Sequence, residues 1–339
     1  SQGQQRGGEE FGFSRNHGEA LFRRRALNTR RAFPAIAHRT QSGETGKSTP
    51  MPDNFVTRFA PSPTGFLHLG HAFSALTAFD AARAAGRVLA LRIEDIDRTR
   101  CKPEFETAIY EDLRWLGVAW AEPVRRQSDH MEDYRAALDA LIARGLCYRC
   151  FKTRTEILDE IARAPHLSPS GPEGPAYVGA PLAAYEERSL LAEGAPFAWR
   201  LSLAAAEAAL DGFGALHFIE EDVDGADRRR IAAAPGMFGD VVLGRKDSGA
   251  SYHLASVHDD ARAGVTHVIR GEDLGPAAHL HTLLYALLEA PAPVYRHHRL
   301  ITDDQGRRLA KRDKAVALRA LREAGVTPAE VRARLGLID

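Results

Sequence analysis

Residues 58–71 decide the fold and read Arg-Phe-Ala-Pro-Ser-Pro-Thr-Gly-Phe-Leu-His-Leu-Gly-His. A short apolar run at their start and an alanine-rich run after them predict a strand over 56–59 and a helix over 70–85. The two prolines hold the connecting loop extended, and the glycines let backbone or a flat ring approach closely. The stretch therefore predicts a strand that turns, through an open loop, into the beginning of a helix.

Two histidines, His68 and His71, stand where this helix is expected to begin, on either side of Gly70. A helix start presents unpaired backbone N–H groups and a partial positive charge, which attract phosphate. Because the histidines lie three residues apart, a helical segment places them on one face, where both imidazoles can donate to phosphate oxygens. The pattern indicates a phosphate-binding helix start.

Outward from this stretch, short apolar runs alternate with helical runs, which is typical of a parallel sheet flanked by helices. We expect sheet segments at 88–93, 240–243, 251–257 and 266–269, and helices at 103–116, 131–144 and 277–288. Gly, Pro and Ser residues gather between 164 and 181, which predicts a long excursion from the core. The sequence thus predicts an α/β fold whose sheet is interrupted by an insertion.

Polar residues at the carboxyl ends of parallel strands are the informative ones, because ligands bind there in open sheets. Arg58, Glu94 and Arg270 stand at such ends. Two arginines can each bind a carboxylate with a fork of donors, and one glutamate can pair with an ammonium group. This set of charges matches an amino acid with an acidic side chain, namely glutamate.

The His-Leu-Gly-His motif resembles the His-Ile-Gly-His signature of class I aminoacyl-tRNA synthetases, and the frame from Arg58 to Gly65 resembles the glutamyl branch. The resemblance covers roughly 55–318 and includes motifs at 91–97, 251–255 and 270–274. It implies a Rossmann nucleotide-binding fold with an inserted smaller α+β subdomain. The residues it implies for catalysis and ATP binding are His68, Gly70 and His71, and those for glutamate are Arg58, Phe59, Ala60, Pro61, Ser62, Glu94, Tyr252 and Arg270.

A second signature, at residues 308–313, reads Arg-Leu-Ala-Lys-Arg-Asp. It resembles the Lys-Met-Ser-Lys-Ser loop of class I synthetases and places Lys311 at the lysine that contacts ATP. A mobile cation suits adenylate formation, because negative charge builds on the α-phosphate and on the leaving pyrophosphate. Ala310 replaces the usual serine, so one hydrogen bond of that loop is not expected here.

The cysteines Cys101, Cys147 and Cys150 are too few for a disulfide framework and indicate a reducing compartment. Related enzymes carry Cys-x-Cys followed by Tyr-x-x-x-Cys as a zinc site. The corresponding positions here are Cys150, Lys152, Tyr177 and Pro181. Tetrahedral zinc needs four ligands and two thiols are missing, so we expect no bound metal. Cys150 and Tyr177 remain the weak candidates, with Cys147 and His166 as possible substitutes.

The chain has 339 residues, with 45 basic and 45 acidic side chains. Residues 1–50 contain nine basic and four acidic side chains, so 36 basic and 41 acidic side chains remain in the rest of the chain. This mildly acidic remainder argues against a broad basic surface for nucleic acid.

We expect 1–50 to be a disordered leader or a mis-assigned extension before a start at Met51, since four glutamates weaken the alternative of a transit peptide. The expected domains are a Rossmann domain in two halves (51–146 and 236–300), an insertion (147–235), and a signature loop with a short helical stub (301–339).

Only 27 residues follow Arg312, whereas an anticodon-binding domain needs roughly 100. The chain therefore resembles the truncated glutamyl-Q tRNA(Asp) synthetases. This implies ATP- and Mg²⁺-dependent activation of L-glutamate and its transfer to queuosine in the anticodon loop of tRNA(Asp), independent of tRNA(Glu). The alternatives are a discriminating or fragmentary glutamyl-tRNA synthetase that charges an acceptor end, and a catalytically silent RNA-binding paralogue, against which the intact signature residues argue. We expect a cytoplasmic monomer with no membrane partner.

Overall fold

The computed structural model describes residues 54–163, 170–302 and 316–337. All of them belong to one compact unit, residues 43–339. The expectations for residues 1–50, His166 and Lys311 lie outside the described residues. Within the described part, no helix combines the length and the apolar character that crossing a bilayer requires.

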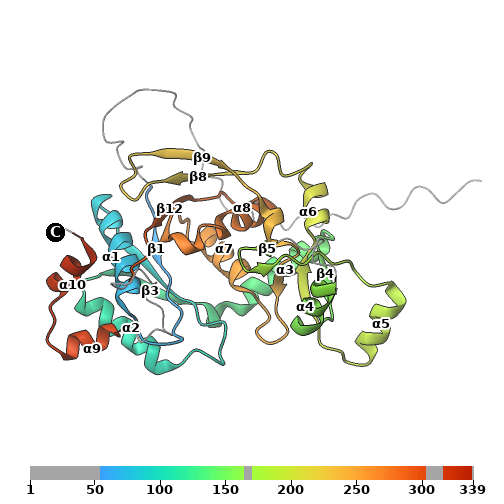
Figure 1. Cartoon of the computed structure of the whole chain (residues 1–339), viewed down its shortest axis with the longest axis horizontal. Helices are drawn as coiled ribbons and strands as arrows, with labels where there is room; N and C mark the ends of the chain where they lie inside the picture. The colour runs from blue at the N-terminus through green and yellow to red at the C-terminus, as the bar shows by residue number, and fades with distance from the viewer. Residues whose placement is uncertain (1–53, 164–169, 303–315, 338–339) are drawn as a thin grey trace, which may run out of the picture. The chain divides into compact units, whose positions relative to one another are not determined.

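A parallel sheet in two adjoining halves forms the centre of the unit (Figure 1). In the first half β1 pairs with β2 and β2 with β3, and in the second half β11 pairs with β12 and β12 with β8. Only the edge strand β9 runs antiparallel. The strand bounds are Arg58–Phe59 (β1), Leu89–Ile93 (β2), Trp120–Arg126 (β3), His217–Glu221 (β8), Arg228–Ala232 (β9), His267–Gly271 (β11) and Val294–His298 (β12).

The two halves meet at Val56, whose carbonyl accepts the N–H groups of Thr266 (2.9 Å) and His267 (3.1 Å). The sheet therefore runs from β3 through β2 and β1 to β11, β12, β8 and β9. After β1 the chain first forms β2 and β3 on one side of it, and later forms β8, β9, β11 and β12 on the other side. Such a reversal opens a crevice at the carboxyl ends of the two central strands, here β1 and β11.

Helices cover the sheet on the predicted pattern, and the alanine-rich helix α1 lies directly on β1, β2 and β11. Its alanines Ala72, Ala75, Ala78 and Ala82 are buried, so small side chains let the helix approach the strands closely. The large helices are α1 (Leu69–Ala84), α2 (Pro103–Trp115), α3 (Met131–Ala143), α7 (Tyr252–Arg262) and α8 (Ala277–Leu287).

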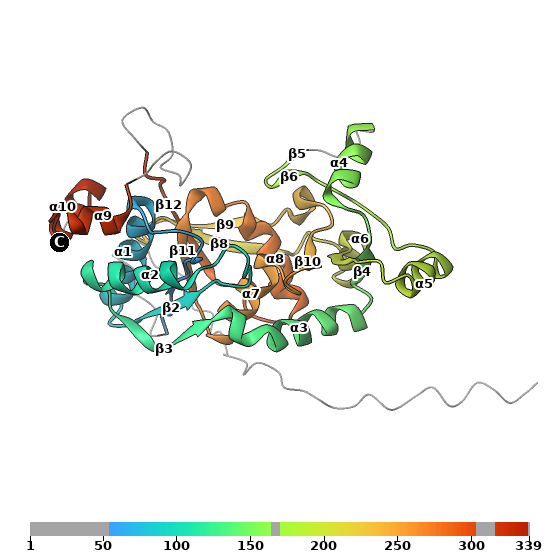
Figure 2. The same ribbon diagram turned by 90° about the horizontal axis from the view of Figure 1, so that it is seen from below.

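The inserted elements lie on the opposite side of α7 and α8 from α1 and α2 (Figures 1 and 2). They build an antiparallel sheet from β4, β7 and β10, together with helices α4, α5 and α6 and the small hairpin β5–β6. The bounds are Cys147–Cys150 (β4), Arg154–Arg163 (α4), Ser170–Gly171 (β5), Gly174–Pro175 (β6), Ala184–Ala192 (α5), Ala198–Leu201 (β7), Leu203–Ala209 (α6) and Val242–Gly244 (β10).

Buried Asp240 ties the inserted segments together. Its carboxylate accepts hydrogen bonds from the Tyr148 hydroxyl, the Gly179 N–H and the Leu203 N–H, each at 2.9 Å. These donors come from separate stretches of the insertion, so one side chain fixes three of them. The predicted insertion, 147–235, also contains β8 and β9, although these strands pair with β12 of the main sheet. Strand pairing thus returns the chain to the main sheet near His217, and the domain boundaries themselves stay a prediction.

One secondary-structure prediction was wrong, because residues 251–257 begin helix α7 instead of forming part of the sheet. The Ser251 side chain accepts the Leu254 N–H at 3.4 Å and caps the helix start. Buried Leu254, Ala255 and Val257 then line the inner side of the helix. A serine cap before an apolar run is a helix-start signal that outweighs the apolar run itself.

The C-terminal segment is part of the core and not an appendage. Its helices are α9 (Leu318–Glu323) and α10 (Pro328–Leu335), and Leu318, Val331 and Leu335 are buried in the same cluster as α1. The Leu318 N–H donates to the carbonyl of Leu67 at 2.8 Å, directly before the first signature histidine.

Asp112 on α2 is fully buried beneath α9, and neither carboxylate oxygen has a hydrogen-bond partner among the described residues. The nearest cation is Arg322, with Nη1 3.7 Å from Oδ1. Burial raises the pKa of Asp112 from 3.8 to about 6. Between these pH values the folded protein binds a proton that the unfolded chain releases, so stability falls as the pH rises from about 4 to about 6.

In the wild type, Asp112 should therefore lower the unfolding free energy by about 1–3 kcal/mol between pH 4 and pH 7. We expect Asp112→Asn to lack this contribution. Urea unfolding at both pH values measures this loss. Glu111→Gln is the control for the charge alone: half-exposed Glu111 also contacts Arg322, and because burial is the largest cause of the raised pKa of Asp112, this variant should keep most of the wild-type pH dependence. An equal pH dependence in wild type and Asp112→Asn would contradict the assignment.

Candidate active site

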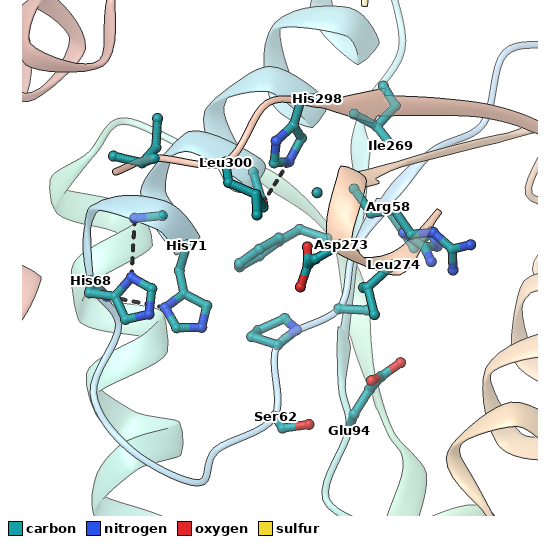
Figure 3. Close-up of a pocket in the computed structure, with 18 of the residues that line it drawn as sticks. Arg58, Ser62, His68, His71, Glu94, Ile269, Asp273, Leu274, His298 and Leu300 are labelled. Atoms are coloured by element: carbon teal, nitrogen blue, oxygen red, sulfur yellow. Dashed lines mark hydrogen bonds between the residues drawn. The ribbon is translucent and has the colours of Figure 1, made fainter. Parts of the chain in front are cut away.

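A cavity of about 500 Å³ opens at the carboxyl ends of β1, β2, β11 and β12 (Figure 3). Every residue predicted for catalysis, ATP binding or glutamate binding in the described part of the chain lines it, whereas Lys311 lies outside that part. Figure 3 shows the two signature histidines on one side of the cavity and Arg58 and Glu94 on the other. The predicted residues on its wall are Arg58, Phe59, Ala60, Pro61, Ser62, His68, Gly70, His71, Glu94, Tyr252 and Arg270.

A buried ion network forms one wall. The Asp260 carboxylate of α7 accepts hydrogen bonds from Nε of Arg58 at 3.0 Å and from Nη1 of Arg92 at 2.5 Å. Arg92 also donates a hydrogen bond to Glu94 at 2.9 Å. The two arginines hold the pKa of Asp260 below its ordinary value, although burial opposes them. Burial raises the pKa of Glu94 and outweighs the opposing effect of Arg92. Glu94 thus lies in a site where a further cation would stabilise its charged form.

Arg270 of β11 is buried but incompletely paired. Its Nη1 and Nη2 atoms have no hydrogen-bond partner among the described residues, and its guanidinium lies 5.1 Å from the ring centre of Tyr295. Its Nε donates to Nε2 of His297 at 3.4 Å, and Nδ1 of His297 lies 2.7 Å from Glu220. Burial and Arg270 lower the pKa of His297, so the neutral ring accepts from Arg270 and donates to Glu220.

A buried guanidinium with two unsatisfied terminal nitrogens is costly, and a carboxylate or phosphate is the ligand that satisfies both at once. Arg270 faces the cavity that also contains Glu94. The free fork and the carboxylate together can bind an anionic and a cationic group of one small molecule.

His68 and His71 cap the start of α1. Nδ1 of His68 accepts the Gly70 N–H at 3.1 Å, and Nδ1 of His71 accepts the His68 N–H at 3.2 Å. Because each Nδ1 accepts, each neutral ring carries its proton on Nε2. A Cβ at Gly70 would lie 3.0 Å from Cε1 of His68, so a larger residue would displace this imidazole by a few tenths of an ångström. The cap thus fixes both rings as Nε2–H donors.

Sequence reasoning missed several residues of the site. Asp260 accepts a hydrogen bond from Arg58, Arg92 donates one to Glu94, and His297 orients Arg270. His298 lines the cavity at the end of β12, with Nε2 2.8 Å from the hydroxyl of Ser74. Its place at a strand end is a signal that could have identified it, whereas the contact between Asp260 and Arg58 joins residues far apart in the chain and leaves no local pattern.

The weak metal candidates lie in the insertion, away from this cavity. Cys150 and Tyr177 are buried in one small cluster, and Lys152 Nζ lies 5.7 Å from the ring centre of Tyr177. Burial raises the pKa of Cys147 to about 12, which disfavours a thiolate ligand. Over the described ranges, no three or more His, Cys, Asp or Glu side chains gather as a metal site would require. The expectation of no zinc stays a prediction.

Comparisons with known proteins agree with this geometry. The family model for the catalytic domain of class I tRNA synthetases (E and Q) matches residues 54–338. The glutamyl-Q tRNA(Asp) synthetase of Rhodobacter capsulatus is 49% identical over 83% of this chain and 100% of its own length. That of Symbiobacterium thermophilum is 41% identical over 83% and 87%. The glutamate-tRNA synthetase structure from Elizabethkingia anophelis aligns with a TM-score of 0.62 at 30% identity, over 76% of this chain and 53% of that one.

The chain belongs to the class I tRNA synthetase family for glutamate and glutamine, a family of ligases, and to its glutamyl-Q tRNA(Asp) synthetase members. The predicted fold class and family are thereby confirmed. The chain spans about half the length of the solved glutamate-tRNA synthetase. The roles of the individual site residues are not tested by these comparisons and stay predictions.

We expect Arg270→Met to weaken glutamate binding by about 2–5 kcal/mol, because the substrate carboxylate loses its bidentate partner. The unfolding free energy should not fall, since methionine retains much of the bulk and removes a buried charge whose terminal nitrogens have no hydrogen-bond partner among the described residues. Calorimetric titration with L-glutamate and urea unfolding measure the two quantities.

The matched control is Arg296→Met on the neighbouring strand, where Arg296 donates to Glu221 through Nε (2.9 Å) and Nη2 (2.7 Å). This change leaves buried Glu221 with the more distant, exposed Arg228, at 3.6 Å, as its cationic partner, so it should lower the unfolding free energy by about 3–5 kcal/mol. Arg270→Met protein with normal glutamate affinity would contradict the assignment of Arg270.

Proposed function

We propose that this enzyme activates L-glutamate with ATP and transfers the glutamyl group to the queuosine base of tRNA(Asp). The single observation that carries the amino-acid half is the buried fork of Arg270, which no described residue pairs, in the same cavity as Glu94. Glu94 binds the substrate ammonium, while Arg270 and Arg58 each bind one of its two carboxylates. Three charges in one cavity thus match the three charges of glutamate.

The nucleotide half rests on the start of α1. The Nε2–H groups of His68 and His71 donate to ATP phosphate oxygens, and the helix start adds its partial positive charge. By family resemblance, Lys311 supplies a further cation to the phosphates. Mg²⁺ fits this chemistry as a companion of the triphosphate, because it binds substrate phosphates and retains several waters.

The proposed reaction proceeds in two displacements. An α-carboxylate oxygen of glutamate attacks the α-phosphorus of ATP, the bond to the bridging oxygen breaks, and pyrophosphate leaves with its electrons. The product is glutamyl-adenylate. A hydroxyl of the tRNA then attacks the carbonyl carbon, loses its proton, and releases AMP. Preorganised donors around the phosphates stabilise the charge that develops in the first step.

The RNA target rests on different support from the chemistry. The relatives from Rhodobacter capsulatus and Symbiobacterium thermophilum are named for tRNA(Asp), and each matches this chain over most of its own length. We therefore infer queuosine-containing tRNA(Asp) as the acceptor. None of the three cysteines forms a disulfide, which is in keeping with a reducing cytoplasm.

The test uses purified tRNA(Asp) with and without queuosine, incubated with radiolabelled glutamate and ATP. We expect label only on the queuosine-containing tRNA, and nuclease digestion should recover it on the anticodon fragment. Label at the acceptor end of tRNA(Glu) would support a glutamyl-tRNA synthetase instead. Absence of glutamate-dependent ATP–pyrophosphate exchange would contradict any synthetase activity.

A further inference from the structure

The hairpin β5–β6 of the insertion contacts the start of helix α7, next to a residue that lines the cavity. Its turn is formed by Pro172 and Glu173, and its backbone packs against the short helix η3 (Pro235–Phe238). A Cβ at Gly171 would lie 2.3 Å from the carbonyl oxygen of Met237, so the hairpin is held at backbone contact distance. The position of the turn is therefore well defined by packing.

Glu173 at this turn contacts a buried imidazole. Its Oε1 and Oε2 atoms lie 3.0 Å and 3.3 Å from Nε2 of His253, and Nδ1 of His253 lies 3.1 Å from Nε2 of His281. The carboxylate accepts the Nε2–H of His253, and the Nδ1 atom of the same ring forms a hydrogen bond with Nε2 of His281. Burial and nearby Arg270 hold the pKa of His281 well below its ordinary value, in keeping with a neutral ring.

These two imidazoles pack beside Tyr252, one of the residues that line the cavity. Tyr252 precedes His253 in the chain, and its ring centre lies 5.3 Å from that of His253 and 5.8 Å from that of His281. Phe238 of η3 packs edge-on to His253 at 6.2 Å. The orientation of His253 thus bears directly on the place of Tyr252.

We propose that Glu173 is a positioning residue for the glutamate pocket, which it reaches through His253, His281 and Tyr252. The proposal rests on the proposed function of the cavity and adds a role for the inserted hairpin. The Glu173 side chain is 56% exposed, so water can reach Nε2 of buried His253 and replace a missing carboxylate there. Loss of its carboxylate should therefore change ligand binding more than folding.

The experiment compares Glu173→Ala and Glu173→Gln in the full-length protein. For Glu173→Ala we expect the Michaelis constant for glutamate in ATP–pyrophosphate exchange to rise about fivefold to tenfold, the effect of one lost hydrogen bond. The Michaelis constant for ATP, kcat and the melting temperature should stay near wild type. Glu173→Gln should restore most of the affinity, because its amide oxygen still accepts the N–H of His253.

Glu193→Ala is the matched control, because Glu193 lies in the insertion and its carboxylate contacts only the exposed Ser189 hydroxyl in the described part of the chain. It should leave both Michaelis constants unchanged. A Glu173→Ala enzyme with normal glutamate kinetics would overturn the proposal. So would a joint loss of glutamate affinity, ATP affinity and melting temperature, which would mean a purely structural role. A wild-type enzyme without glutamate-dependent exchange would contradict the proposed function itself.

Discussion

The catalytic centre depends on one buried carboxylate, that of Asp260. It accepts hydrogen bonds from Arg58 on β1 and Arg92 on β2, and so joins helix α7 to both strands. Two arginines at adjacent strand positions would repel each other in a buried site, and a shared anion removes that cost. The same contact orients Arg58 toward the cavity and leaves Arg92 to hold Glu94. Folding of the sheet and assembly of the pocket thus rely on the same interaction.

The pocket also separates groups that are satisfied within the protein from groups that await a ligand. Asp260 pairs with the Nε of Arg58 and the Nη1 of Arg92 within the protein, whereas the terminal nitrogens of Arg270 have no partner among the described residues. His297 takes only the Nε of Arg270 and is itself held by Glu220. The guanidinium is therefore oriented by the fold while its fork stays available for a carboxylate. Buried Arg270 therefore lowers the folding stability of the protein without its ligand and serves ligand binding instead.

Much of the fold could be predicted from the sequence, because local patterns determine it. The strand, extended loop and alanine-rich helix of residues 56–85 follow from proline, glycine and periodicity, and the structure has them within two residues at each end. The sheet assignment of 251–257 failed because the cap at Ser251 was overlooked. The candidate site was predicted from strand ends and a family resemblance, yet Asp260 and Glu173 were not, since their partners are brought near only by tertiary folding.

The central claim is that the cavity recognises glutamate by its two negative charges and one positive charge. Calorimetric titration of the wild-type enzyme with L-glutamate and L-glutamine tests it most directly, because the two amino acids differ by one carboxylate and are nearly equal in size. The account predicts that glutamine binds at least about 30-fold more weakly, as expected when an arginine loses its anionic partner. Equal affinity for the two amino acids would contradict it.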